Sequence, residues 1–351
     1  MNTSNTQLSV IVPTLNESAA LGILLGQLKQ QRSIQLQIIV ADGGSKDGTD
    51  ELALTQGVEL SRSAVGRGRQ MNTAVRLADA PFLLFLHADS QLTDDHQLNR
   101  ALLTLQAAGK NYKDERTAGH FRLCFRRRAA DNALAYRYYE RKSALNRPEC
   151  TNGDQVFLLA RAFFDELHGF DESLWFLEDQ RLAERIHQTG RWITLPGVLE
   201  TSARRFEKEG LGRRMVLSAL IMNFHSMGLD EFFHHADTVY RDQDQTGRLR
   251  LAPIFKLIHS LNREAGIRVT LRRWHATGHY VLSHAWQPFF FLDVALGKGT
   301  SEAERPCLRF YDRIFRPVTN FIVFEYVTAG LTWIWYRISW AVYALQEHRE
   351  R

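Results

Sequence analysis

Short polar strings that directly follow apolar runs are the feature that most constrains the fold of this chain. Each string closes a run with the length and composition of a buried strand: residues 13–17 after 8–12, residues 42–48 after 38–41, and residues 87–89 after 82–86. Helical patterns separate these strands, and strands that alternate with helices predict an α/β fold with a mainly parallel sheet. Because parallel strands end at the same edge of a sheet, we expect the polar strings to line one ligand-binding crevice.

The expected helices and strands reach well beyond the first hundred residues. Asn16 or Ser18 can cap a helix running to about residue 30, and Asp47 can cap a helix through residue 54. Further strands are predicted over residues 119–125, 156–159 and 192–199. We therefore expect a catalytic domain over residues 1–210 and a helical, aromatic-rich extension over residues 211–351.

The composition excludes several classes of protein. A hydrophobic content of 44% and a charged content of 24% are typical of a globular chain. The net charge is +5, and the basic residues are spread along the chain. The sequence contains no recognisable nucleic-acid reading module, so we expect no nucleic-acid partner. Cys124, Cys150 and Cys307 lie too far apart to predict a zinc site or a disulfide framework. The polar start of the chain lacks a secretion signal, which indicates a cytoplasmic protein.

The C-terminal extension contains an apolar stretch over residues 318–336 that is interrupted by Glu325. The carboxylate and the short uncharged run argue against an ordinary transmembrane helix. Trp333, Trp335 and Arg337 suit a membrane interface, where rings and cations meet lipid headgroups. A peripheral position on the cytoplasmic face of the inner membrane and a helix packed on the protein or on a second copy remain open alternatives.

Two glycines and two arginines open a predicted helix at residues 66–72. Free backbone N–H groups and the helix dipole at such a start favour an anion. We expect Arg67 or Arg69 to contact a diphosphate and Asn72 to anchor the loop, although a solvated arginine-rich turn explains the same residues.

Acidic residues at three further places carry the expected chemistry. Asp89 follows a buried strand, and a single carboxylate together with diphosphate oxygens can hold Mg²⁺ or Mn²⁺. Glu178 and Asp179 open a helix, where acids also occur simply to satisfy the helix dipole. Trp175, just before this pair, could stack on a sugar ring or belong to the core.

In this order and context, the strings resemble the inverting nucleotide-sugar glycosyltransferases of glycosyltransferase family 2. The Gly-Arg-Gly-Arg-Gln-Met-Asn, His-Ala-Asp and Ser-Ala-Arg-Arg strings look closest to a small bacterial subgroup linked to the arsenosugar pathway or to selenium domains. The resemblance covers about residues 8–230. It implies the Rossmann-like nucleotide-sugar fold called GT-A, a divalent metal and a nucleotide-diphosphate sugar as donor, with a UDP-sugar and a hexose favoured.

The resemblance also implies roles for individual residues. Asp42 would read the nucleotide base, Asp89 would bind the metal, and Asp179 beside Glu178 would be the catalytic base. The remaining donor-site positions implied by the resemblance are Pro13, Glu17, His87, Gly153, Asp154, Arg204 and Arg205. His87 stands where the family usually has a first acid, which leaves the metal identity open.

Two other functions fit parts of the pattern. A nucleotidyltransferase also uses a parallel sheet and a carboxylate-bound metal, but residues 13–16 lack the Gly-rich phosphate loop expected after its first strand. A catalytically inactive scaffold would explain His87, whereas the acids at positions 42, 89 and 179 argue against it. The acceptor stays unknown at this stage.

Overall fold

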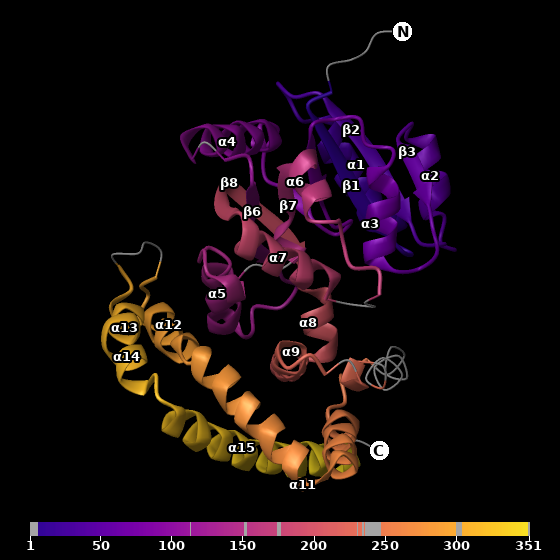
Figure 1. Cartoon of the computed structure of the whole chain (residues 1–351). Helices are drawn as coiled ribbons and strands as arrows, with labels where there is room; N and C mark the ends of the chain where they lie inside the picture. Colours follow the sequence, from indigo (N-terminus) through magenta and orange to yellow (C-terminus); the bar gives the residue numbers. More distant parts are fainter. Residues whose placement is uncertain are drawn as a thin grey trace. The chain divides into compact units, whose positions relative to one another are not determined.

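A computed structural model describes residues 6–112, 114–150, 153–173, 177–229, 231–233, 235, 247–299 and 304–349. The chain divides into two compact units, which are treated separately below (Figure 1). The first unit comprises residues 1–126 and 135–202, and the second comprises residues 127–134 and 203–351. The division at residue 210 expected from the sequence stays a prediction.

An eight-stranded sheet forms the centre of the first unit, in the order β3-β2-β1-β4-β7-β6-β8-β5. Its strands are β1 (Leu8–Thr14), β2 (Leu36–Asp42), β3 (Glu59–Arg62), β4 (Phe82–Phe85), β5 (Gln91–Leu92), β6 (Thr117–Arg126), β7 (Phe157–Ala160) and β8 (Arg191–Ser202). Strands β7 and β5 run against the other six. The expected α/β fold with a mainly parallel sheet is confirmed.

Helices cover both faces of this sheet. They are α1 (Ser18–Lys29), α2 (Thr49–Thr55), α3 (Arg67–Val75), α4 (Gln97–Tyr112), α5 (Ala133–Lys142), α6 (Arg161–Glu166) and α7 (Glu178–Thr189). Successive strand residues point to opposite faces, so Val10 packs with α1 and α4 while Ile11 packs with α3, α6 and α7. Burial of β1 on both faces explains why its sequence is a continuous apolar run.

The strand order places a topological switch at β1. The chain leaves β1 for β2 on one side and later returns to β4 on the other, with β1 parallel to both neighbours. Connections to opposite sides leave a crevice at the carboxyl ends of the two strands. Residues after Thr14 and after Phe85 therefore meet at the position where this fold class binds ligands.

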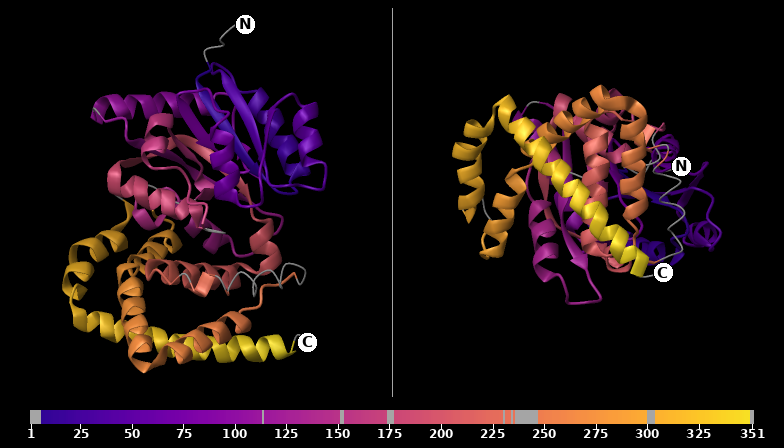
Figure 2. Two further views of the ribbon diagram at one scale, coloured as in Figure 1. Left: turned by 45° about the vertical axis from the view of Figure 1, so that its right-hand side comes forward. Right: turned by 90° about the horizontal axis from the view of Figure 1, so that it is seen from below.

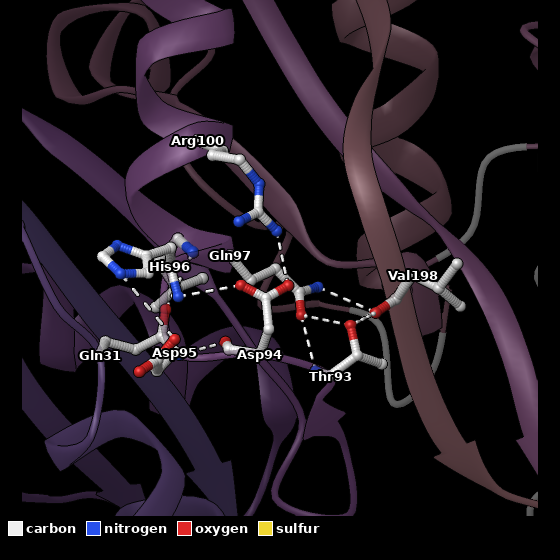
Figure 3. Close-up of polar contacts among 9 residues, drawn as sticks. Gln31, Thr93, Asp94, Asp95, His96, Gln97, Arg100 and Val198 are labelled. Carbon is white, nitrogen blue, oxygen red and sulfur yellow. Dashed lines mark hydrogen bonds and ion pairs between the residues drawn. The ribbon is translucent and has the colours of Figure 1, made fainter.

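The segment after β4 is fixed by the start of α4 (Figure 3). Gln97 Oε1 accepts hydrogen bonds from the backbone N–H and the hydroxyl of Thr93, at 2.7 and 3.0 Å, and Gln97 Nε2 donates to the Val198 carbonyl at 2.9 Å. Gln31 of the loop after α1 donates to the Asp94 carbonyl at 2.7 Å. The loop between β4 and α4 is thereby held at its far end.

The second unit is helical. It contains α8 (Arg204–Glu209), α9 (Leu211–Ser226), α11 (Ala252–Ser283), α12 (Trp286–Ala295), α13 (Pro306–Phe310), the π-helical turn η4 (Tyr311–Phe315), α14 (Arg316–Thr319) and α15 (Ile322–Arg349). Helices α11 and α15 lie side by side in Figures 1 and 2, and Gly266 kinks α11 at a φ of 76°. The expected helical extension is confirmed.

A buried ion pair ties both ends of this helical unit together. Arg213 of α9 lies 3.3 Å from Glu347 of α15, and Glu347 also accepts a hydrogen bond from the Leu251 N–H at 2.7 Å. Removing one partner of such a pair leaves an uncompensated buried charge, which is costly. Within the described ranges, no helix combines the length and apolar character that crossing a bilayer requires.

Candidate active site

The loop after β2 is organised around the Asp42 carboxylate. One oxygen accepts hydrogen bonds from the Thr14 hydroxyl at 3.1 Å and the Ser45 hydroxyl at 2.5 Å. The other accepts from the backbone N–H groups of Gly44 and Ser45, at 2.8 and 2.9 Å. Asp42 is 1% exposed, and four hydrogen bonds fill the usual acceptor capacity of a carboxylate. In this geometry Asp42 shapes the loop; reading a base, which stays a prediction, requires one of these bonds to be exchanged.

The loops after β1 and β2 are also locked to each other. Asn16 donates its backbone N–H to the Ser45 hydroxyl and accepts from the Lys46 N–H, both at 2.8 Å. Asp47 accepts from the backbone N–H groups of Ser18 at 3.0 Å and Thr49 at 3.2 Å, so one carboxylate caps both α1 and α2. The Asp47 carboxylate also accepts a hydrogen bond from the Thr49 hydroxyl. This bond, together with the two backbone bonds, lowers the pKa of Asp47 to about 2.

Pro13 and Glu17 lie on the same rim, as expected. Pro13 pairs with Ala41 in the register between β1 and β2, and the Glu17 backbone N–H donates to the Thr49 hydroxyl at 3.1 Å. Both residues therefore border the carboxyl ends of β1 and β2, and their contacts with a donor stay predictions.

Helix α3 supports the ends of β1 and β2 through the side chain of Gln70. Gln70 Nε2 donates to the carbonyls of Thr14 at 2.8 Å and Ala41 at 2.9 Å, which joins the ends of β1 and β2. A Cβ at position 43 would lie 3.0 Å from the Gln70 side chain, so Gly43 makes room for this brace. The sequence analysis missed the role of Gln70, although a polar residue on the buried face of a predicted helix was the available signal.

Asn72 anchors a loop, but the loop is the one that precedes α7. Its side chain accepts from the Phe170 N–H and donates to the Phe170 carbonyl, both at 2.9 Å, and it donates to Glu172 at 3.0 Å. Gly68 allows the same approach, because a Cβ there would lie 3.3 Å from Glu178 Cβ. The glycine–arginine string thus brings the start of α3 against the start of α7.

Arg67 and Arg69 both reach acidic partners in this arrangement. Arg69 lies 3.4 Å from Glu172, and Arg67 Nη1 lies 3.5 Å from Glu178 Oε1. Glu178 is 1% exposed, and burial raises the pKa of its carboxyl to about 7 against the opposing effect of Arg67. Both arginines keep much of their side chains exposed to solvent, as residues that bind an anionic ligand must.

Asp179 is positioned by a glycine. Its Oδ2 accepts the Gly153 N–H at 3.0 Å, and its Oδ1 accepts the Gln180 N–H at 2.7 Å. A Cβ at position 153 would lie 2.1 Å from Asp179 Oδ2, so any side chain there would displace the carboxylate. The described residues donate two hydrogen bonds to Asp179 rather than four, which leaves acceptor capacity on a half-buried side chain.

Asp89 lies just beyond β4, and its carboxylate has no hydrogen bond or ion pair among the residues that the structure describes. Its backbone carbonyl accepts from Arg126 Nη2 at 2.8 Å, so a residue at the end of β6 fixes the loop. The sequence analysis did not single out Arg126, because the contact joins positions 37 residues apart and no motif marks it.

His87 lies among the acids of the crevice. Its Nδ1 is 3.5 Å from Asp154 Oδ1. Burial lowers the pKa of His87, with a further lowering by Arg67, while the charges of Asp154, Asp89 and Asp179 oppose that shift. The contacts of His87 with Asp154, of the Gly153 N–H with Asp179 and of Arg67 with Glu178 bring together the end of β4, the turn at residues 153–155 and the starts of α3 and α7.

The donor set fits a divalent cation that needs the substrate to complete its shell. In the described part of the chain, no group of three or more His, Cys, Asp or Glu side chains is arranged to hold a metal by itself. The unengaged Asp89 carboxylate suits Mg²⁺ or Mn²⁺, which proteins often bind through one or two carboxylates plus substrate phosphates.

Two of the predicted positions belong to the second unit. Arg204 and Arg205 open α8 of the second unit, where Arg205 pairs with Glu209 at 3.1 Å. Their contact with a donor stays a prediction. Trp175 lies outside the described residues.

Comparisons with known proteins find similarity to glycosyltransferases. Residues 9–167 match the family model described as Glycosyl transferase family 2. A "PGL/p-HBAD biosynthesis glycosyltransferase" of Mycobacterium bovis and another of Mycobacterium tuberculosis are each 33% identical over 99 residues, which cover 26% of this chain and 39% of the relative. The chain thus matches about two fifths of the length of these relatives.

Solved structures of similar architecture include a mannosyltransferase of Pyrobaculum calidifontis, in complex with GDP-Man and Mn²⁺. It has a TM-score of 0.45 and 19% identity, covering 95% of this chain and 88% of that one. Residues 1–349 of Staphylococcus aureus TarS in complex with UDP have a TM-score of 0.44 and 17% identity, covering 91% and 90%. The arsenosugar or selenium subgroup is not confirmed by these relatives. The match of residues 9–167 to the Glycosyl transferase family 2 model agrees with the resemblance to that family found in the sequence.

Proposed function

We propose that the protein is a metal-dependent, inverting glycosyltransferase that moves a sugar from a nucleotide-diphosphate sugar to an acceptor hydroxyl. We expect the transferred sugar to be a hexose. The observation that carries the proposal is a set of contacts at the β1–β4 switch point. His87 lies 3.5 Å from Asp154, the neighbouring Gly153 N–H holds the Asp179 carboxylate at 3.0 Å, and Arg67 lies 3.5 Å from Glu178, while Asp89 follows His87 by two residues. A carboxylate for a metal, a second for a proton and a cation for phosphate are the groups that this reaction requires. The family 2 domain supports the same assignment.

Asp179 is the proposed catalytic base. The acceptor oxygen attacks the anomeric carbon as its proton passes to the Asp179 carboxylate, and the bond to the departing diphosphate breaks with its electron pair on the diphosphate oxygen. One displacement of this kind inverts the anomeric configuration. The Gly153 and Gln180 N–H groups fix the carboxylate while leaving it able to accept the proton.

The donor would bind to the loops after β1 and β2, to the arginines and to the Asp89 side of the crevice. The proposal places the nucleotide on the loops after β1 and β2, with a UDP-sugar preferred and Asp42 holding the loop that receives it. Arg67, Arg69, Arg204 and Arg205 are the candidates for contact with the diphosphate. Mg²⁺ or Mn²⁺ held by Asp89 would stabilise negative charge on the leaving diphosphate. Burial lowers the pKa of His87, next to this carboxylate, which favours the neutral imidazole.

A thermal-shift panel of nucleoside diphosphates, with and without Mn²⁺, tests this proposal. A ligand at 100 times its Kd stabilises the folded state by about 2.7 kcal/mol, which is readily measured. We expect a UDP shift that requires Mn²⁺ and disappears in Asp89→Asn. The absence of any shift with a folded protein would contradict the transferase site and favour the inactive scaffold.

A further inference from the structure

The outward side of α15 in the second unit carries an apolar stripe. Its residues recur at intervals of three or four and are between 43% and 63% exposed: Val327, Leu331, Ile334, Ile338, Val342 and Leu345. At 1.5 Å per residue the stripe is about 27 Å long. Contiguous exposed apolar surface of this extent marks an interaction site in a soluble protein.

The stripe faces away from the neighbouring helix. Ala329, Tyr336 and Glu347 are the buried residues of α15, and helical geometry places them on the side opposite to the stripe. Tyr336 packs beside Phe255 of α11 and donates its hydroxyl proton to the Phe255 carbonyl at 3.1 Å. Packing within the unit therefore uses one side of α15 and leaves the other without a partner among the described residues.

Acidic groups are kept off this outward surface. Glu325 contacts two histidines of α11, His279 at 2.8 Å and His275 at 3.0 Å. The exposed cation near the middle of α15 is Arg337, whose guanidinium lies 5.9 Å from the ring centroids of Trp333 and Trp340. Aromatic rings beside a cation are typical of side chains at the level of lipid headgroups.

A row of arginines precedes the stripe on α13, η4 and α14. Arg309, Arg313 and Arg316 recur at intervals of four and three, are exposed, and make no ion pair with any residue that the structure describes. Exposed Phe310 and Ile314 form an adjacent apolar row. A helix with neighbouring basic and apolar rows suits a surface that offers both anionic groups and hydrocarbon.

We propose that residues 309–345 of the second unit bind the surface of a bilayer containing anionic phospholipid. Two copies of the chain are disfavoured as an alternative, because the flanks of the stripe carry rings and the cation Arg337 but no exposed acidic side chain of α15 that could pair with this cation and set the register between two helices. The arginine row adds attraction to anionic headgroups, because its three cations outnumber Asp312, the acid within residues 309–316. This inference is independent of the proposed transferase activity.

Flotation of the full-length protein with vesicles tests the inference. Vesicles of phosphatidylcholine alone are compared with vesicles that also contain phosphatidylglycerol, at low and high salt. The test variants are Arg309→Gln/Arg313→Gln/Arg316→Gln and Ile334→Ser/Ile338→Ser. The matched controls change exposed residues elsewhere: Arg76→Gln/Arg122→Gln/Arg137→Gln and Ile23→Ser/Leu103→Ser. All variants are first shown to melt cooperatively.

We expect binding that requires phosphatidylglycerol and weakens with salt. Near an anionic surface each arginine contributes about 1 kcal/mol, so the triple arginine variant should bind on the order of 100-fold more weakly while its control retains binding. Equal flotation of the arginine variant and the wild type would overturn the inference. A folded wild type that fails to float, but dimerises through Ile334 and Ile338 in sedimentation velocity, would overturn it in favour of a second copy.

Discussion

The two sides of the crevice use their carboxylates in opposite ways. After β2, Asp42 accepts four hydrogen bonds and Asp47 joins the starts of two helices. After β4 and at the start of α7, Asp89 has no partner for its carboxylate among the described residues and Asp179 accepts two hydrogen bonds. The carboxylates after β2 thus hold the backbone in place, whereas those after β4 and at the start of α7 keep oxygens that can accept a metal ion or a proton.

The difference arises from the backbone around each acid. After β2, the N–H groups of Gly44 and Ser45 and the Ser45 hydroxyl all donate to Asp42, so the turn itself occupies most of the acceptor capacity of this carboxylate. Asp89 follows a strand whose loop is held by Arg126 from outside, through the backbone carbonyl rather than the side chain. A carboxylate keeps its oxygens available for a ligand when other groups make the hydrogen bonds that hold its loop in place.

Asp179→Asn should produce the largest loss. Removing a general base typically costs 10²–10⁴ in rate, so we expect kcat to fall by about 10³. Donor affinity should stay unchanged, because Asp179 is not among the proposed donor-binding residues. The amide oxygen can still accept one of the two backbone N–H groups that hold the carboxylate. Steady-state kinetics with the identified donor measures this. A variant that retains wild-type kcat would remove Asp179 from the role of base.

Gly153→Ala should break the same side of the crevice through geometry alone. The added Cβ would collide with Asp179 Oδ2, which we expect to lower kcat by on the order of 10² by misplacing the base. Gly26→Ala is the matched control, because nothing lies within 4 Å of a Cβ at that helical position. Similar kinetics for the two alanine variants would show that the position of Asp179 is unimportant.

Asp42→Asn should act on stability first. Two of its four accepted hydrogen bonds would meet an amide donor, and buried donors without partners cost about 1–3 kcal/mol. We expect the free energy of unfolding to fall by about 2 kcal/mol in urea titrations. Asp79→Asn, at an exposed position, serves as the control and should have little effect. Unchanged stability in Asp42→Asn would contradict its scaffold role.

Glu178→Gln should have a smaller effect that depends on pH. Burial raises the pKa of Glu178 to about 7, so between pH 4.5 and 7 the folded state binds a proton that the unfolded chain releases. The free energy of unfolding therefore falls as pH rises through this window, with a slope of at most about 1.4 kcal/mol per pH unit, and levels off above it. The Gln variant should lose this slope, whereas Glu51→Gln at an exposed site should keep it. An identical slope in Glu178→Gln would refute the assignment.

Much of the fold could be read from the sequence because its signals are local. The apolar run 8–12, the turn at Asp42 and the helix start at Gly66 each predict one element and one edge of the sheet. The short strand β5 and the reversal of β7 have no such signal, because they depend on pairing with β8 and β4.

The sequence predicted that the acids of the candidate site follow neighbouring strands or open a helix, but it did not predict how each carboxylate is used within the fold. Residue types and spacing indicated Asp42, Asp89 and Asp179 equally, but the number of hydrogen bonds that each carboxylate accepts depends on tertiary contacts. The brace by Gln70 and the contact of Arg126 with the Asp89 carbonyl also join distant segments. Periodicity and spacing carry no information on such contacts.

Titration calorimetry of UDP with and without Mn²⁺, on wild type, Asp89→Asn and Asp42→Asn, tests the contrast between the two sides most directly. We predict that Asp89→Asn melts like the wild type and loses the enhancement of UDP binding by Mn²⁺. We predict that Asp42→Asn melts at a lower temperature and keeps that enhancement below its melting temperature. Full enhancement by Mn²⁺ in Asp89→Asn would contradict the account.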